Sequence, residues 1–229
     1  MKISVIIPTL NEAEGIQRLI SHIQRFSDPE LIDEIIVVDG HSNDNTCELA
    51  ERLGAKVVLS ETRGRARQMN IGAELAKGDI LYFLHADSFP PENFDTEILK
   101  EIKDNYLGGC FRMQFDSKHP LLKAFAWFTR FSYNICRGGD QSLFITRELF
   151  NKIGCFDNNL LIIEDLEIIP RIKRHTIFKV IPKTIVTSVR KYRENGFFRL
   201  QFIFSVINVL YCMGASHEYL LNIYNKRIV

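Results

Sequence analysis

The sequence predicts a three-layer α/β/α fold with a mostly parallel central sheet and a C-terminal helical extension. Three short apolar runs, at 3–7, 35–38 and 80–84, are rich in β-branched residues and end in polar or acidic ones. Such runs are typical of buried parallel strands. Segments with helical spacing separate them, as in βαβ units. The length of 229 residues suits one α/β domain.

The elements of the first part follow in order. After the strand at 3–7, residues 14–26 carry apolar side chains at the i, i+3, i+4 spacing of an amphipathic helix. Glycines then mark the ends of two further helices, as C-terminal caps commonly do. We expect strands at 34–38, 56–59 and 80–84, and helices at 43–54 and 65–77.

After Pro90-Pro91 the pattern changes. We expect helices at 94–106, 120–133, 147–153 and 164–173, strands at 142–145, 179–181 and 186–189, and an exposed-edge strand at 109–115. No linker rich in Gly, Ser or Pro interrupts the chain, so both parts are expected to share one sheet. The predicted organisation is a single domain, 1–229, with halves at 1–88 and 89–196 and the extension at 197–229.

Composition excludes several classes of protein. Hydrophobic content of 46% with 25% charged residues is ordinary for a folded domain. A net charge of +1 gives no signal for nucleic acid. Five scattered cysteines without C-x-x-C spacing favour reduced thiols over disulfides or zinc, and the first apolar run is too short for a signal peptide. A cytoplasmic protein is expected.

Polar residues follow three of the predicted strands. Asn11, Glu12, Asp39, His85 and Asp87 come directly after them. Because open α/β sheets bind ligands at the carboxyl ends of their strands, these side chains should converge on one cleft. Gathered carboxylates repel one another unless a cation or a hydrogen-bonding ligand lies among them. A ligand site is therefore predicted at this edge.

Six motifs occur in a characteristic order: PTLNE, VVDGHSNDNT, KGD, LHADS, GGDQSLFITRELFNKIGCFD and IEDLEIIPRIKR. Over residues 3–193 this set resembles the family 2 glycosyltransferases, which are inverting nucleotide-sugar enzymes of the GT-A fold. The resemblance implies transfer of a sugar from a nucleotide-diphosphate donor, with a UDP-sugar expected, to an acceptor hydroxyl or phosphate. It makes 1–88 the nucleotide-binding half and 89–196 the acceptor half.

The resemblance also implies a donor site. The loop that holds the nucleotide would be formed by Pro8, Thr9, Asn11 and Glu12. Asp39 would accept a hydrogen bond from the base, although Asp39 and Asp44 could instead only cap a turn and a helix. Arg65 and Arg67, with Asn70 one turn further, would contact the nucleotide phosphates, or form a solvated basic face.

The LHADS segment implies a divalent ion. Asp87 would bind Mg²⁺ or Mn²⁺, which bridges to the diphosphate and neutralises it as it leaves. His85 replaces the first acid of the usual D-x-D, and imidazole suits Mn²⁺ better than Mg²⁺. His85 could also hydrogen-bond the ribose or a phosphate, or serve the fold alone.

The resemblance places the acceptor chemistry in the second half. Asp165 would be the general base and Glu164 a supporting acceptor contact, although the two acids could instead only favour a helix N-terminus. Gly138, Gly139 and Asp140 would line the acceptor pocket, the glycines permitting close backbone approach. Asp140 could also be only a turn residue.

Two apolar stretches, 121–137 and 197–215, have no role in these motifs. The second is interrupted by polar residues and is a poor transmembrane span. Each stretch either packs onto the domain, or lies on a membrane surface or in a homodimer interface. If both are exposed, the acceptor is expected to be a lipid and the protein peripheral on the inner membrane face.

Other classes fit less well. A nucleotidyltransferase should have a Gly-rich loop with a lysine after the first strand, and a dehydrogenase needs G-x-G-x-x-G there. The PTLNE segment has neither. A non-catalytic sugar-nucleotide-binding module stays open because His85 breaks the metal motif.

Overall fold

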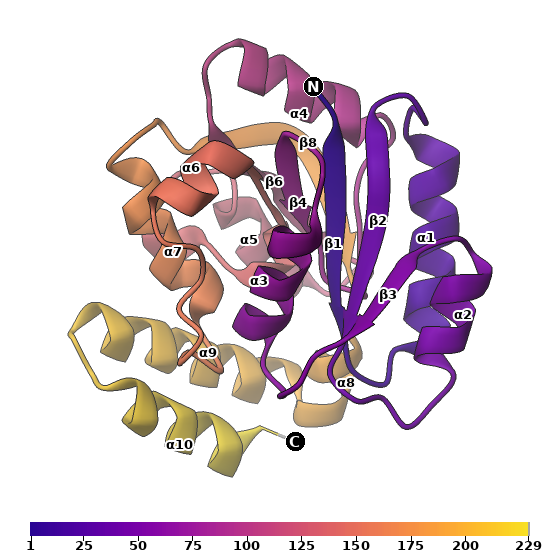
Figure 1. Cartoon of the computed structure of the whole chain (residues 1–229). Helices are drawn as coiled ribbons and strands as arrows, with labels where there is room; N and C mark the ends of the chain where they lie inside the picture. Colours follow the sequence, from indigo (N-terminus) through magenta and orange to yellow (C-terminus); the bar gives the residue numbers. More distant parts are fainter. Residues whose placement is uncertain (229) are drawn as a thin grey trace.

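The computed structural model describes residues 1–228, and at residues 135 and 139 it describes the backbone alone. A single eight-stranded sheet has the order β3-β2-β1-β4-β7-β6-β8-β5 (Figure 1). The strands are β1 Ile3–Thr9, β2 Ile32–Asp39, β3 Lys56–Leu59, β4 Ile80–Phe83, β5 Ser88–Phe89, β6 Gly108–Phe115, β7 Leu143–Thr146 and β8 Lys179–Thr187.

Helices cover both faces of this sheet, which confirms the three-layer prediction. The helices are α1 Ala13–Phe26, α2 Thr46–Arg52, α3 Arg65–Leu75, α4 Phe94–Lys103, α5 Pro120–Phe128, α6 Arg147–Lys152, α7 Glu164–Lys173, α8 Arg190–Asn195, α9 Phe197–Cys212 and α10 His217–Arg227, with short 3₁₀ turns η1 Asn134–Cys136 and η2 Gly139–Gln141.

The core lies on both sides of the sheet. One cluster joins the sheet to α1, α2 and α4, and a second joins its other face to α3, α6 and α7. Successive side chains of a strand point to opposite faces. Along β1, Val5 and Ile7 accordingly lie in the first cluster and Ile6 lies in the second. Because β1 is buried on both faces, both sets of alternating side chains are apolar, which explains the continuous apolar run in its sequence.

Strands of both predicted halves belong to the same sheet. β1 pairs in parallel with β2 and β4, β2 with β3, and β6 with β8. β7 is antiparallel to both β4 and β6, and β5 is antiparallel to β8. The sheet is therefore mostly parallel, as predicted, and β7 joins the second half to the first.

The expected exposed edge strand at 109–115 is wrong. β6 lies between β7 and β8, and its first four residues are buried. Only the segment around Arg112 and Gln114 is partly or fully exposed, and it produces the alternation that suggested an edge. Periodicity reports the exposure of side chains and says nothing about which strands lie on either side.

The two short strands expected at 179–181 and 186–189 form one strand, β8. Its register against β6 shifts between Phe111 and Arg112, opposite Pro182 and Lys183. Proline has no N–H to donate to a ladder, so the irregularity at this position is expected. The helix expected at 120–133 ends at Phe128.

The C-terminal extension is helical, as predicted, with residue 229 outside the described residues. Figure 1 shows α9 and α10 side by side at one end of the molecule. Within residues 1–228, no helix combines the length and the apolar character needed to cross a membrane.

Candidate functional site

Asp39 holds together the loop that follows β2. Its side chain is fully buried. One carboxylate oxygen accepts from the Ser42 backbone N–H at 2.7 Å, and the other accepts from Thr9 Oγ1 at 3.0 Å and Ser42 Oγ at 2.5 Å. The predicted base-recognition residue therefore lies at the carboxyl ends of β1 and β2, where three hydrogen bonds fix its orientation.

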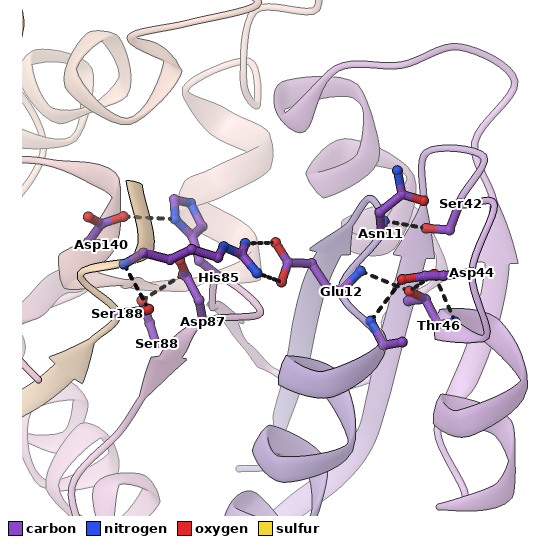
Figure 2. Close-up of polar contacts among 12 residues, drawn as sticks. Asn11, Glu12, Ser42, Asp44, Thr46, His85, Asp87, Ser88, Asp140 and Ser188 are labelled. Atoms are coloured by element: carbon purple, nitrogen blue, oxygen red, sulfur yellow. Dashed lines mark hydrogen bonds and ion pairs between the residues drawn. The ribbon is translucent and has the colours of Figure 1, made fainter. Parts of the chain in front are cut away.

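The loop after β1 is tied to the loop after β2 (Figure 2). The Asn11 N–H donates to Ser42 Oγ at 2.7 Å, and Asn11 Oδ1 accepts from the Asn43 N–H at 2.8 Å. The Glu12 N–H donates to Thr46 Oγ1 at 2.9 Å. Through these hydrogen bonds the predicted nucleotide-loop residues Asn11 and Glu12 hold the two loops together as one wall of the site at the edge of the sheet.

Asp44 supports the same wall. It accepts from the Ala13 N–H at 3.2 Å and from the Thr46 N–H at 3.1 Å. Burial acts to raise the pKa of Asp44, but the hydrogen bonds from Thr46 and Ala13 outweigh it and hold the pKa below its ordinary value. Asp44 therefore binds the first residues of α1 and α2, Ala13 and Thr46, although the N-cap position of α2 is Asn45.

Three possible metal ligands meet beyond β4. One ligand atom each from His85, Asp87 and Asp140 lies within 4.8 Å of the others. His85 Nδ1 is 3.3 Å from Asp140 Oδ1, and His85 Nε2 is 3.9 Å from Asp165 Oδ2. Asp140, predicted for the acceptor pocket, is thus brought to the two predicted metal ligands.

Electrostatics of this cluster favour a bound cation. Burial, followed by the negative charge of Asp140, raises the pKa of Asp87. Burial acts to raise the pKa of Asp140, but the hydrogen bond with His85 and the positive charges of His85, Lys191 and Arg65 together outweigh it and lower that pKa. Two carboxylates and one imidazole form a donor set that suits Mn²⁺, so the residues present fit a divalent ion.

Glu164 and Asp165, the first two residues of α7, have different neighbours: Glu164 pairs with Arg65, and Asp165 lies near His85. Glu164 is fully buried, and Arg65 Nε lies 2.8 Å from its Oε1. Burial raises the pKa of Glu164, and the positive charge of Arg65 offsets part of this effect. Asp165 lies on the His85 side instead. The predicted donor residue Arg65 and the predicted acceptor residue Glu164 are therefore partners of each other.

Arg67 and Asn70 hold the segment that leads into α7. Arg67 Nε donates to the Asn158 carbonyl at 2.9 Å. Asn70 Nδ2 donates to the Phe156 carbonyl and to Asn158 Oδ1, both at 2.8 Å, and Asn70 Oδ1 accepts from the Phe156 N–H at 3.0 Å. Both side chains serve the fold here, and a donor contact by either stays a prediction.

Sequence reasoning gave no role to an ion pair that spans the site. Arg190 at the start of α8 binds the carboxylate of Glu12 through both terminal nitrogens, with Nη1 at 3.0 Å from Oε2. The hydrogen bond with Glu12 raises the pKa of Arg190 above its ordinary value. No local signal could have found this pair, because its members lie 178 residues apart.

A small cavity lies on the acceptor side. Its lining includes Gly138 and Asp165, both predicted for this region, together with Arg137, Gln141 and Ser142. Its volume is about 10 Å³, which is room for one water molecule. Residue 139 lies in η2, and nothing more of it is among the described residues. Arg137 was missed, since a lone arginine before two glycines carries no specific signal.

Comparison with known proteins identifies relatives of the chain. Residues 4–156, about two thirds of its length, match the family described as Glycosyl transferase family 2. Glycosyltransferase AglE of Haloferax volcanii is 26% identical over 175 residues, covering 69% of this chain and 57% of that protein. The dolichol-phosphate mannosyltransferase of Pyrococcus furiosus is 34% identical over 109 residues, covering 45% and 31%. The chain spans about a third to just over half of these relatives.

Solved structures share the fold. Staphylococcus aureus TarS in complex with UDP superposes with a TM-score of 0.68 and 20% identity, over 92% of this chain and 66% of that one. The mannosyltransferase PcManGT of Pyrobaculum calidifontis, in complex with GDP-Man and Mn²⁺, gives 0.70 and 22%, over 94% and 65%. The family match covers more than half of the sequence, and the chain therefore belongs to glycosyltransferase family 2.

Proposed function

We propose that the chain transfers a sugar from a nucleotide-diphosphate donor, a UDP-sugar, to an acceptor with inversion and with the help of a divalent ion. The observation that carries this proposal is the meeting of His85, Asp87 and Asp140 beside Asp165. It joins a candidate metal site to a carboxylate that can serve as a base. TarS and PcManGT, which share the fold, were solved with UDP and with GDP-Man and Mn²⁺.

His85, Asp87 and Asp140 would hold Mn²⁺ or Mg²⁺. A bound divalent ion supplies positive charge that neutralises the leaving diphosphate. The side chains hold the three ligand atoms close together before any ion binds, at the cost of repulsion between Asp87 and Asp140. This repulsion supports the proposal, because a cation would relieve it.

Asp165 would take the proton from the acceptor hydroxyl as that oxygen attacks the anomeric carbon. The ion pair between the partly exposed Arg65 and the buried Glu164 would hold the first turn of α7 and with it the position of Asp165. Glu164 would then act through this ion pair and not by touching the acceptor.

The donor nucleotide would lie against the loops after β1 and β2. Asp39 would accept a hydrogen bond from the base, which requires the fully buried carboxylate to become accessible when the nucleotide binds. Pro8, Thr9, Asn11 and Glu12 would shape the wall beside it.

The exposed aromatic side chains support a membrane-surface contact. Trp127, Phe128 and Phe131 around the end of α5 are 47%, 50% and 37% exposed, and Phe198 and Phe202 of α9 are 73% and 70% exposed. Residues 117–139 and 195–217 contain no acidic residue, so an anionic membrane would not be repelled there. A lipid-linked acceptor follows from this contact, with a homodimer as the alternative use of the same surface.

Titration of UDP with and without Mn²⁺, followed by an assay of UDP-sugar hydrolysis, tests the proposal. Metal-dependent binding with hydrolysis supports an enzyme, and metal-dependent binding without hydrolysis supports a non-catalytic sugar-nucleotide-binding module.

In a matched experiment, His85→Asp should shift the preference from Mn²⁺ toward Mg²⁺. An unchanged preference would show that His85 is not a ligand.

A further inference from the structure

Arg137 is a buried cation without a counterion among the described residues. The residue is 4% exposed. Its Nη1 donates to Cys110 Sγ at 2.9 Å, and its Nη2 donates to the backbone carbonyls of Thr129 and Phe131. Nε is buried and has no hydrogen-bond partner within residues 1–228. Buried charges in proteins are normally paired, so this arrangement needs an explanation.

The neighbours of Arg137 add positive charge and do not compensate it. Lys173 donates to the Ser132 carbonyl at 2.5 Å and to Asn134 Oδ1 at 2.6 Å. Burial, followed by the positive charge of Arg137, lowers the pKa of Lys173. Burial raises the pKa of the Cys110 thiol, so the sulfur is neutral and cannot serve as the counterion. The one carboxylate that lines the cavity beside Arg137 is Asp165, and no ion pair joins the two among the described residues, so Arg137 can still accept an anionic partner.

The cavity connects this cation to the proposed base. Arg137 and Asp165 line the same cavity. Gln141 and Ser142 add further polar groups to its lining. About 10 Å³ admits one water-sized group. One oxygen of an oxyanion fits such a volume, while the rest of the ligand would remain outside.

We propose that the acceptor carries an acidic group, a carboxylate or a phosphate, and that one of its oxygens accepts a hydrogen bond from Arg137 Nε. This contact would direct the acceptor hydroxyl toward Asp165. The inference rests on the proposed function for the role of Asp165, whereas the anion site itself rests on Arg137 alone.

Binding of inorganic phosphate and of acetate tests the anion site and shows whether it prefers a phosphate or a carboxylate. Calorimetric titrations would be run with excess UDP and Mn²⁺ present, so that the donor site is blocked. Wild-type protein should bind at least one probe. Arg137→Met should weaken that binding roughly tenfold or more, the effect of losing a hydrogen bond to a charged group. The exposed Arg130 supplies a matched control, since Arg130→Met should bind like wild type.

Two results would overturn the proposal: wild type that binds neither probe, or Arg137→Met that binds both as wild type does. If Arg137→Met does not fold, wild-type crystals soaked in bromide replace it. An anomalous peak beside Arg137 Nε is then expected, and its absence rejects the site. Asp87→Asn separates this inference from the proposed function. It should remove most of the metal-dependent gain in UDP affinity, while the part of phosphate or acetate binding that is lost on adding Arg137→Met to Asp87→Asn should stay as large as in wild type.

Discussion

The two sides of the site differ in how their buried polar groups are satisfied. On the donor side, Asp39 accepts three hydrogen bonds and Asn11 and Asp44 bond to neighbouring backbone. On the acceptor side, Arg137 Nε and both oxygens of Glu164 are buried without a hydrogen bond among the described residues, although Arg65 lies in ion-pair range of Glu164. Buried polar groups are normally bonded. The donor side therefore needs no further hydrogen-bonding partner. On the acceptor side Glu164 is paired with Arg65, and Arg137 Nε still lacks a partner among the described residues.

The largest expected effect tests the acceptor side. Asp165→Asn should lower turnover by about 10² to 10⁴-fold, the usual contribution of general base catalysis, and leave donor and metal affinity nearly unchanged. Steady-state transfer, with a thermal melt to check folding, measures this. The exposed Asp157 provides a control, since Asp157→Asn should be as active as wild type. Near wild-type transfer by Asp165→Asn would mean that the base lies elsewhere.

A second effect tests the cluster between the two sides. Asp87→Ala, or EDTA, should remove most of the metal-dependent gain in UDP affinity, because a bare carboxylate repels the diphosphate. The expected loss is at least about tenfold, since even outer-shell changes at metal sites cost this much. Calorimetry with and without Mn²⁺ measures it, with Asp104→Ala as an exposed control. Equal UDP affinity in Mn²⁺ and EDTA would falsify the metal assignment.

A third effect tests whether the hydrogen bonds of Asp39 stabilise the donor side in the absence of nucleotide. Asp39→Asn replaces an acceptor of three hydrogen bonds by a group that also donates, and leaves a buried donor without its partner. We expect a loss of about 1–3 kcal/mol in the free energy of unfolding, measured by urea denaturation without nucleotide. Asp104→Asn should change it little. An unaltered free energy of unfolding would show that the hydrogen bonds of Asp39 do not stabilise the fold, which would leave recognition of the base as its role.

The smallest effect concerns the exposed surface beside the acceptor side. Phe202→Ser should change the unfolding free energy by no more than about 0.5 kcal/mol, because the side chain is 70% exposed. It should weaken co-sedimentation with anionic vesicles if α9 lies on a membrane. Unchanged vesicle binding by both Phe198→Ser and Phe202→Ser would favour the dimer or another use of this surface.

The donor side was the more predictable of the two. Asp39, Glu12 and Asp87 follow strands whose apolar runs are local, so their convergence on one edge could be inferred from parallel pairing alone. The acceptor side could not be inferred in this way. Asp140 was assigned to the acceptor pocket and lies against His85, since β7, which follows it, pairs with β4. The true place of β6 inside the sheet was missed for the same reason.

The sequence by itself determined the alternation of strands and helices, the mostly parallel sheet and the edge at which polar residues gather. These features depend on the period of apolar side chains, which is a local property. Only the tertiary structure decided that Asp140 meets His85, that Arg190 binds Glu12, and that Arg137 is buried without a counterion among the described residues. Each of these depends on strand order and on packing between segments far apart in the chain, and no local pattern of residues encodes either.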